Sequence, residues 1–248
     1  MDISPDAKVI LLTGASSGIG EATARHLARM GHHLVIGARR TERLAVLQKE
    51  LRAEGCEVDT VELDVTRLEG LQRMVDFARE RHGQIDVLIN NAGVMPLSPP
   101  LAALKVDEWN RMIDVNIKGV LHGIAAVLPV MHAEGKGHII NIASIGAHAV
   151  SPTAAVYCAS KFAVRAISDG LRQETDQIRV SVISPGVVQS ELADHITDET
   201  ARAAMEEFRR VALPPPQAVA QAIAYAISQP DDVDVSEIIV RPTASPPF

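Results

Sequence analysis

The sequence predicts a single α/β domain: a doubly wound, mostly parallel sheet of about seven strands with helices on both faces. Short β-branched apolar runs alternate with longer helical stretches along the chain. Several runs, such as Val9–Leu12, are apolar without alternation, as a strand covered by helices on both faces requires. The length of 248 residues suits one large domain, so we expect residues 1–248 to form a single unit.

The expected elements follow one another in strand–helix units, and right-handed crossovers between such units give a doubly wound sheet. We expect strands at Val9–Leu12, Leu34–Gly37, Val58–Leu63, Val87–Ile89, His138–Ala143, Val180–Ile183 and Glu237–Val240. We expect helices at Glu21–Met30, Glu42–Glu54, Leu68–His82, Asp107–Val127, Ala154–Asp176 and Gln217–Ser228.

Composition and charge narrow the classes of partner. The chain is 47% hydrophobic and 22% charged, which is ordinary for a globular protein. Its formal net charge of −7 predicts no basic surface for nucleic acid. Residues 1–8 lack a signal-peptide pattern, and no run of about 18 apolar residues is evident. We therefore expect a cytoplasmic protein with neither a nucleic-acid nor a membrane partner.

The cysteines and histidines do not suggest a metal centre or a disulfide framework. Cys56 and Cys158 are too few and too far apart for either a disulfide framework or a CxxC site. The nine histidines are scattered without an HExxH motif or paired metal spacing. We expect reduced thiols and no metal.

A glycine-rich turn, Thr13–Gly20, joins the first expected strand to the first expected helix with the spacing Gly-x3-Gly-x-Gly. Gly14 and Gly18 allow conformations or approaches that a Cβ atom would block, and Gly20 lets the helix pack on the sheet. Backbone N–H groups and the helix dipole then face a pyrophosphate. A tight βα turn uses glycine for steric reasons too, but this placement favours a Rossmann dinucleotide site that includes Ser16, Ser17 and Ile19.

The segment after the second expected strand indicates which dinucleotide binds. Ala38 stands where NAD-using folds carry an acid for the adenine ribose 2′-OH, and Arg39 and Arg40 follow. Arginine offers a fixed fork of donors to a 2′-phosphate. The alternative is two solvated arginines, but a helix N-terminus disfavours positive charge. We expect NADP(H), with Arg39 as the main contact and Arg40 as the second.

Tyr157 and Lys161 lie four residues apart in an expected helix, so the hydroxyl and the ammonium share one face. Because an adjacent ammonium favours phenolate, Lys161 tunes the tyrosine as an acid–base group. Ser144, 13 positions before Tyr157, follows the fifth strand and can donate a hydrogen bond to a carbonyl oxygen. Each residue alone has a structural interpretation, namely core tyrosine, solvated lysine and strand-capping serine. Their combination with the upstream phosphate loop predicts catalysis.

Taken together, the motifs resemble the short-chain dehydrogenase/reductase family over almost the whole chain. The resemblance rests on Thr13–Gly20, Asn90-Asn91-Ala92-Gly93, Asn116, Ser144, Tyr157-x3-Lys161 and Pro185-Gly186, in this order. Further segments are similar to NADP-preferring bacterial members of the clavulanate dehydrogenase and 3-hydroxy acid dehydrogenase type: Ala38-Arg39-Arg40, Val156-Tyr157, Leu171–Glu174 and Glu237–Thr243. The resemblance implies an NADP(H)-dependent oxidoreductase that transfers a hydride between the nicotinamide and a small carbonyl or secondary alcohol.

For the adenine half of the cofactor, the resemblance implies that Asp64 and Val65 flank the base. It implies that Asn90 lies beside the cofactor, with Asn91, Ala92 and Gly93 in the adjoining turn. The other interpretation of Asn90–Gly93 is a strand-terminating turn, which asparagine and glycine favour in any protein. Both interpretations are compatible.

For the nicotinamide half, the resemblance implies that Pro185, Gly186 and Val188 pass along the ring. Ser190 stands where threonine is more usual, which keeps the hydroxyl. Tyr157 and Lys161 would contact the cofactor too, with Lys161 on the nicotinamide ribose. Asn116 would hold a water that links Lys161 to solvent.

Residues beyond the catalytic set bear on the substrate. Residues 190–213, including His195 and Phe208, are expected to form a lid over the substrate, and they carry no recognisable charge clamp. His148 and Met95 lie in loops expected to face the pocket, where either can contact substrate. A small ketone, aldehyde or β-keto acid is the first hypothesis, with alcohol oxidation as the reverse reaction.

The fold is compatible with two other functions, and the catalytic helix bears on the assembly. A catalytically idle NADP-binding sensor or scaffold is possible on this fold, but the set Asn116, Ser144, Tyr157 and Lys161 favours catalysis. An epimerase or dehydratase would need a further substrate domain. Because the catalytic helix carries a small-apolar face (Phe162, Ala163, Ala166 and Ile167), we expect a homotetramer or homodimer. The alternative is that this face packs on its own sheet.

Overall fold

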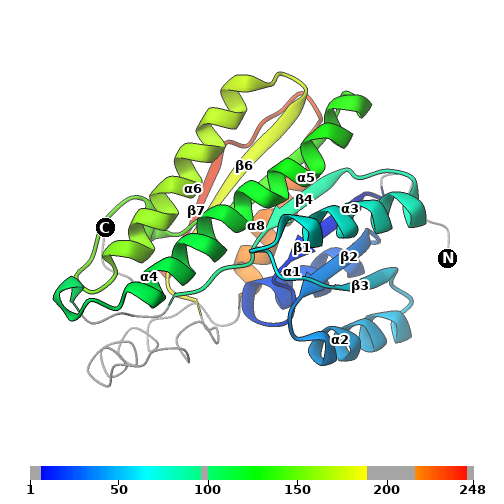
Figure 1. The fold of residues 1–248 in the computed structure, drawn as a ribbon. Coiled ribbons are helices and arrows are strands. Elements are labelled where there is room, and N and C mark those ends of the chain that lie inside the picture. Colours follow the sequence, from blue (N-terminus) through cyan, green and yellow to red (C-terminus); the bar gives the residue numbers. More distant parts are fainter. Residues whose placement is uncertain (1–6, 96–99, 189–215, 245–248) are drawn as a thin grey trace.

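In the computed structural model, which describes residues 7–95, 100–188 and 216–244, the strands form one parallel sheet (Figure 1). Within this part of the chain it has seven strands, in the order β3-β2-β1-β4-β5-β6-β7. Their bounds are β1 (Val9–Thr13), β2 (His33–Ala38), β3 (Val58–Glu62), β4 (Val87–Asn90), β5 (Gly137–Ile142), β6 (Ile178–Pro185) and β7 (Glu237–Val240). The single-domain Rossmann fold predicted from the sequence is confirmed.

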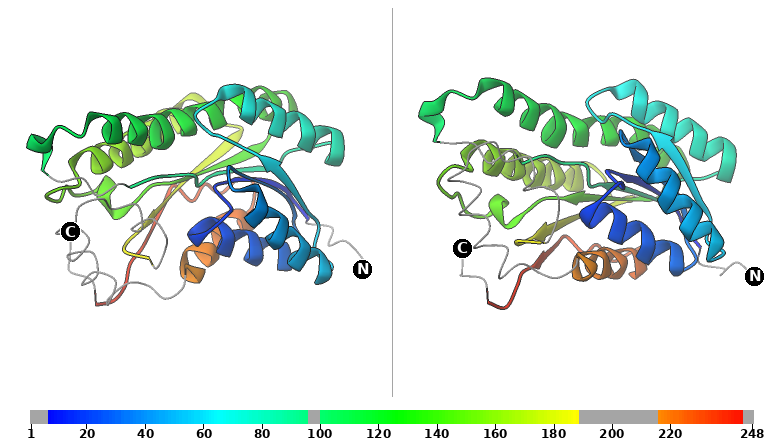
Figure 2. Two further views of the ribbon diagram at one scale, coloured as in Figure 1. Left: turned by 60° about the horizontal axis from the view of Figure 1, so that its bottom comes forward. Right: turned by 90° about the horizontal axis from the view of Figure 1, so that it is seen from below.

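Helices cover both faces of the sheet, as Figure 2 shows. One layer holds α1 (Gly18–Arg29), α2 (Thr41–Ala53) and α8 (Gln217–Ser228). The other holds α3 (Leu68–His82), α5 (Gly119–Glu134) and α6 (Ala155–Glu174). In β1, Ile10 and Leu12 pack into the first layer and Leu11 into the second. Successive strand residues thus enter different cores, which explains the apolar run without alternation.

The order of the strands reverses between β1 and β4. The chain builds β2 and β3 on one side of β1, and then β5, β6 and β7 beyond β4. The connections that leave β1 and β4 therefore go to opposite faces, which opens a crevice at the carboxyl ends of these two strands. The glycine-rich loop and the turn after Asn90 both lie at this crevice.

The helical stretch before β5 departs from the expected single helix Asp107–Val127. A short turn, η1 (Leu101–Ala103), precedes α4 (Val106–Met112), which continues through a π-helical turn, η2 (Ile113–Lys118), into α5. The helix then runs through Pro129 to Glu134. The π turn surrounds Asn116, and such turns often occur at functional sites.

By length and mean hydropathy alone, the helical run Val106–Glu134 qualifies as a candidate membrane span. In this fold it lies over the sheet instead. Its inner side chains enter the core beneath α3 and α6, namely Val120, Ile124, Val127 and Met131. Its outer side exposes Val106, Ile113 and Leu121. We therefore interpret it as a core helix with an apolar outer face.

Candidate active site

The glycine-rich loop forms a tight connection between β1 and α1. Gly14 (φ +71°) and Gly18 (φ +56°) have left-handed backbone conformations that glycine adopts easily. A Cβ atom on Gly14 would lie 2.7 Å from the Cα atom of Ala92. The loop therefore packs directly on the turn after β4, and it presents backbone groups at the N-terminus of α1. This cradle fits a dinucleotide pyrophosphate, and a side chain on Gly14 would disrupt it.

Asn91 braces the loop against the turn after β4. Its Nδ2 atom donates to the carbonyl oxygens of Thr13 (2.9 Å) and Gly14 (3.1 Å). In return, Thr13 Oγ1 accepts from the N–H groups of Asn91 and Ala92, each at 3.0 Å. The sequence placed Asn91 only in an adjoining turn. Its side chain in fact makes the direct connection between the two switch-point strands.

Asn90 uses its side chain differently. Its buried amide donates to Asn141 Oδ1 on β5 (2.9 Å), and Asn141 Nδ2 donates to Ser168 Oγ on α6 (2.9 Å). The chain of hydrogen bonds joins β4 and β5 to α6. Because the amide is engaged there, a role of Asn90 beside the cofactor rests on its backbone and stays a prediction. A Cβ atom on Gly93 would lie 3.5 Å from Asn116 Oδ1 and 3.7 Å from Lys161 Nζ, so the turn reaches the catalytic residues.

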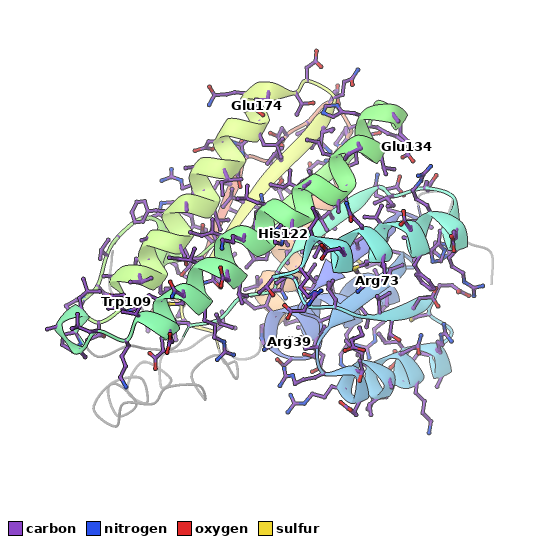
Figure 3. The ribbon with its side chains drawn as sticks, viewed as in Figure 1. Arg39, Arg73, Trp109, His122, Glu134 and Glu174 are labelled. Atoms are coloured by element: carbon purple, nitrogen blue, oxygen red, sulfur yellow. The ribbon has the colours of Figure 1, made fainter. Side chains whose placement is uncertain are left out.

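The two arginines after β2 lie differently. Arg40 extends back to the glycine-rich loop, where its Nε atom donates to Ser16 Oγ (3.1 Å) and its Nη2 atom to Ser17 Oγ (2.6 Å). Arg39 is exposed at the same edge and is labelled in Figure 3. Ala38, the last residue of β2, is buried. Two guanidinium groups thus stand beside the position where an acid would select NAD.

Asp64 follows β3 by two residues and stabilises the turn that it begins. Its Oδ1 atom accepts from Thr66 N (3.0 Å) and Thr66 Oγ1 (2.8 Å). Burial tends to raise the pKa of Asp64, but these hydrogen bonds and the charges of Arg39 and Arg67 lower it below the usual range. Asp64 is therefore ionised at neutral pH and lies near Arg39.

Val65 is held by α5, a contact that the sequence did not predict. The ring atom Nδ1 of His122 is hydrogen-bonded to the Val65 carbonyl oxygen at 2.9 Å. A Cβ atom on Gly119, one turn earlier, would lie 2.8 Å from Val65 Cγ2. Figure 3 labels His122 on this helix. His122 and Gly119 together fix the Asp64-Val65 segment, which the family resemblance places beside the adenine.

Ser144 and Tyr157 form the centre of the catalytic group. Ser144 follows β5 and caps a short turn, η3 (Ile145–Ala147), by accepting a hydrogen bond from Gly146 N at 3.0 Å. Tyr157 lies in the first turn of α6, and its ring and the Ser144 hydroxyl both border Gly146, where an added Cβ atom would lie 3.4 Å from Tyr157 Cε1 and 3.5 Å from Ser144 Oγ. Burial raises the pKa of Tyr157 to about 12, the Ser144 side chain opposes that rise, and the charge of Cys158 adds to it. The hydroxyl is a proton donor at neutral pH.

Lys161 lies one helical turn after Tyr157. Its side chain is buried, and its Nζ atom donates to the Ile142 carbonyl oxygen at 2.9 Å while lying 5.8 Å from the centroid of the Tyr157 ring. Burial lowers the pKa of Lys161 to about 8, because the charged form loses hydration. The ammonium can therefore exchange its proton close to neutral pH, next to the tyrosine.

Asn116 joins this group through the π turn. Its amide pairs with the backbone of Val94, accepting from N at 2.8 Å and donating to O at 2.9 Å. It also donates to Ser160 Oγ (3.0 Å), and Ser160 donates to the Tyr157 carbonyl oxygen (2.7 Å). Ser160 is a residue that sequence reasoning missed, although its place directly before Lys161 was a signal. The structure thus brings Asn116, Ser144, Tyr157 and Lys161 together.

The segment after β6 is described only in part. β6 ends at Pro185, and Gly186 N donates to the Val240 carbonyl oxygen of β7 at 2.7 Å. Val188 packs on the core layer that contains α1 and α8. Ser190, His195, Phe208 and the whole expected lid at 190–213 lie outside the described residues.

His148 and Met95 were expected to face the substrate. His148 is hydrogen-bonded to Glu237 of β7: the His148 Nε2 atom lies 2.8 Å from Glu237 Oε1. Met95 is partly buried and follows Val94, the partner of Asn116. Contact of either residue with substrate stays a prediction.

The fold and the site define a class of protein: a Rossmann-type α/β enzyme with a dinucleotide cradle at the switch point and a Ser–Tyr–Lys group beside it. A family model described as short chain dehydrogenase matches residues 8–201. An uncharacterized oxidoreductase of Staphylococcus saprophyticus is 48% identical, over 96% of each chain.

Two solved structures extend the likeness. An alcohol dehydrogenase from the archaeon Thermococcus sibiricus, complexed with 5-hydroxy-NADP, has a TM-score of 0.87 and 32% identity, over 98% of this chain and 99% of that one. A serine dehydrogenase complexed with NADP+ has a TM-score of 0.86 and 31% identity, over 94% of each chain. The chain belongs to the short-chain dehydrogenase/reductase family, and it is an oxidoreductase with a nicotinamide dinucleotide cofactor and a small-molecule substrate.

Proposed function

We propose that this protein is an NADP(H)-dependent oxidoreductase that interconverts a small carbonyl compound and a secondary alcohol, with Tyr157 as the acid–base group. One observation carries the proposal, namely that Ser144 and Lys161 both lie beside the Tyr157 ring. The Ser144 hydroxyl and the ring border the same glycine, Gly146, and the Lys161 ammonium lies 5.8 Å from the ring centroid. An acid–base group needs a donor, a partner that orients it and a charge that stabilises its conjugate base, and these three residues supply them.

The choice of NADP(H) is supported by the basic edge beside the glycine-rich loop. Arg40 is held over the loop by Ser16 and Ser17, and Arg39 stands next to it. Guanidinium groups bind phosphate with charge-assisted hydrogen bonds. Ala38 leaves no carboxylate to repel a 2′-phosphate. We propose Arg39 as the main contact and Arg40 as the second.

Each catalytic residue has one task in the reduction. The bound dinucleotide supplies the hydride. The Tyr157 hydroxyl donates its proton to the carbonyl oxygen, and its raised pKa keeps that proton available at neutral pH. Ser144 donates a hydrogen bond to the same oxygen, where negative charge develops. Lys161 stabilises the phenolate that remains, and Asn116 positions a water that returns the proton from solvent.

The substrate class we propose is a small ketone, aldehyde or β-keto acid, with the corresponding alcohol as the product or, in reverse, the substrate. The structurally similar serine dehydrogenase supports the aldehyde and acid members of this class, because serine is a small β-hydroxy acid whose primary alcohol corresponds to an aldehyde. We also propose that residues 1–248 act as one NADP(H)-binding domain, with 190–213 over the substrate. The proposal includes a cytoplasmic location.

The measurement that tests this function is NADPH consumption against a panel of small ketones, aldehydes and β-keto acids, with the Tyr157→Phe variant as the control. Substrate-dependent oxidation of NADPH by the parent, lost in the variant, is expected. An idle sensor or scaffold would bind NADPH with no turnover of any compound, and that result would replace the proposal.

A further inference from the structure

Glu237, the first residue of β7, contacts three elements that surround the catalytic group. Its Oε1 atom lies 2.8 Å from His148 Nε2 and accepts a hydrogen bond from Ser184 Oγ at 3.0 Å. Its Oε2 atom lies 3.4 Å from Arg165 Nε. Figure 1 shows β7 beside β6, next to α6. One carboxylate thus joins the loop after β5, the end of β6 and the catalytic helix.

The contact between Glu237 and His148 is linked to Ser144 by a single short turn. His148 ends the η3 turn that Ser144 begins. Two further hydrogen bonds close this turn, from Ala147 N to the Ser144 carbonyl oxygen and from His148 N to that of Ile145, each at 2.9 Å. Because the turn is so short, fixing the His148 side chain restricts where the Ser144 hydroxyl can lie.

The contact between Glu237 and Ser184 fixes the end of β6, on the other side of the candidate site from the Ser144 turn. The Ser184 side chain is fully buried and directly precedes Pro185 and Gly186, which the family resemblance assigns to the nicotinamide. Arg165 lies one helical turn after Lys161. The arrangement is partly buried, with Glu237 exposing 22% of its side chain and His148 14%, so water competes only weakly for these contacts.

We propose that Glu237 is a positioning residue that holds Ser144 in hydrogen-bonding reach of Tyr157, acting through His148. The inference rests on the proposed function, in which Ser144 and Tyr157 act on the same oxygen. A displacement of about 1 Å in a catalytic group costs on the order of a hundredfold in rate, so a brace on the turn affects catalysis without touching the substrate.

Asp234 supplies a matched control on the same stretch of chain. It lies three residues before Glu237 and accepts hydrogen bonds from Arg172 Nε (3.0 Å) and Val180 N (3.2 Å). It therefore docks the segment before β7 to the start of β6 and to α6, away from the Ser144 turn. Replacing Asp234 with alanine weakens this docking, whereas replacing Glu237 with alanine releases the catalytic turn.

The first readout does not depend on turnover. Tyr157 and Tyr225 are the two tyrosines of the chain, so a Tyr225→Phe background reports tyrosinate absorbance from Tyr157 alone. The Ser144 side chain lowers the pKa of Tyr157. In the NADP+ complex, Glu237→Ala is expected to raise this pKa by the same amount as Ser144→Ala, and the double variant no further. Glu237→Gln, which keeps an oxygen acceptor, and Asp234→Ala are expected to leave it unchanged.

The second readout is kinetic. Glu237→Ala is expected to lower kcat about tenfold or more while the KM for NADPH changes less than about threefold. The loss is expected to vanish when Ser144 is already alanine. Two results would overturn the inference. In the first, Ser144→Ala raises the pKa of Tyr157 but Glu237→Ala leaves it unchanged. In the second, Asp234→Ala lowers kcat as much as Glu237→Ala does. A parent enzyme that turns over no carbonyl compound would count against the proposed function, while the titration still decides the role of Glu237.

Discussion

The Tyr157 ring and the Ser144 hydroxyl both border Gly146, although one residue begins α6 and the other follows β5: an added Cβ atom on Gly146 would lie 3.4 Å from Tyr157 Cε1 and 3.5 Å from Ser144 Oγ. The Ser144 side chain acts against burial, which raises the pKa of Tyr157. A tyrosine in this environment stays protonated at neutral pH, so it carries a proton to donate but cannot accept one. The positive nicotinamide of an oxidised cofactor would change that balance.

The first prediction concerns this change in the Tyr225→Phe background. Addition of NADP+ is expected to lower the pKa of Tyr157 from about 12, because positive charge favours the phenolate. Tyrosinate absorbance followed against pH, with and without NADP+, measures the shift. Alcohol oxidation should therefore gain rate as pH rises, while carbonyl reduction loses it. A Tyr157 pKa that NADP+ leaves unchanged would contradict this account.

The second prediction concerns cofactor choice. Arg39→Ala is expected to lower kcat/KM for NADPH at least about tenfold and to leave that for NADH nearly unchanged, because a charge-assisted hydrogen bond to phosphate contributes about 1.5–3 kcal/mol. Arg40→Ala is expected to act in the same direction. Arg29, which pairs with Glu54 at 2.7 Å, offers a control arginine away from the loop. An NADH preference in the parent, or an unaltered NADPH preference in Arg39→Ala, argues against NADP(H).

Much of this architecture was readable in the sequence because its signals are local. The apolar runs of the strands, the glycine spacing and the Tyr157-x3-Lys161 pair each lie within a few consecutive residues. Side chains whose partners are distant gave no such signal. His148 and Glu237 are 89 positions apart, and Asn91 meets Thr13 across 78.

The π turn at Asn116 was also beyond the sequence pattern. A regular α-helix and a helix with one wider π turn show nearly the same pattern of apolar residues in the sequence, so the pattern does not distinguish them. The reason for the wider turn is tertiary, because the Asn116 amide is bonded to Val94 and Ser160. The predicted start of that helix, Asp107, agrees with the observed Val106 within one residue, whereas its predicted end, Val127, falls short of Glu134, where Gly135 (φ +65°) ends the helix.

The third prediction is self-association. Helices α5 and α6 and the π turn expose large apolar side chains, with Leu121 at 43%, Phe162 at 39% and Ile113 at 38%. Such a face on a folded chain is typical of a subunit contact. Light scattering at micromolar concentration should give twice or four times the subunit mass of 26.6 kDa. Phe162→Glu should at least halve the observed mass, and a monomeric parent would remove the prediction.

The fourth prediction is a loss of stability in acid that depends on His138. Burial lowers the pKa of this histidine to about 3, with smaller effects from the charges of Arg179 and Lys8. Between about 6.5 and 3 the unfolded chain takes up a proton at this position and the native state does not, so stability falls as pH falls. By pH 5 this group alone should cost about 2 kcal/mol relative to neutral pH.

Urea unfolding at pH 8 and pH 5 measures this effect. In His138→Gln the difference in unfolding free energy between the two pH values should shrink by about 2 kcal/mol, because the titrating group is gone. The variant is expected to be less stable overall, since His138 Nε2 is hydrogen-bonded to Ser181 Oγ at 2.8 Å. An unchanged pH dependence in His138→Gln would show that other groups cause the acid sensitivity.

The most direct test of the central claim is the turnover number of Tyr157→Phe with NADPH bound and a carbonyl substrate of the parent. The substitution removes only the hydroxyl, and the loss of general acid–base help typically costs about 10²–10⁴-fold. We predict a loss of kcat in that range with NADPH affinity close to that of the parent. A variant that binds NADPH normally and turns over at nearly the parent rate would contradict the assignment of Tyr157 as the proton donor.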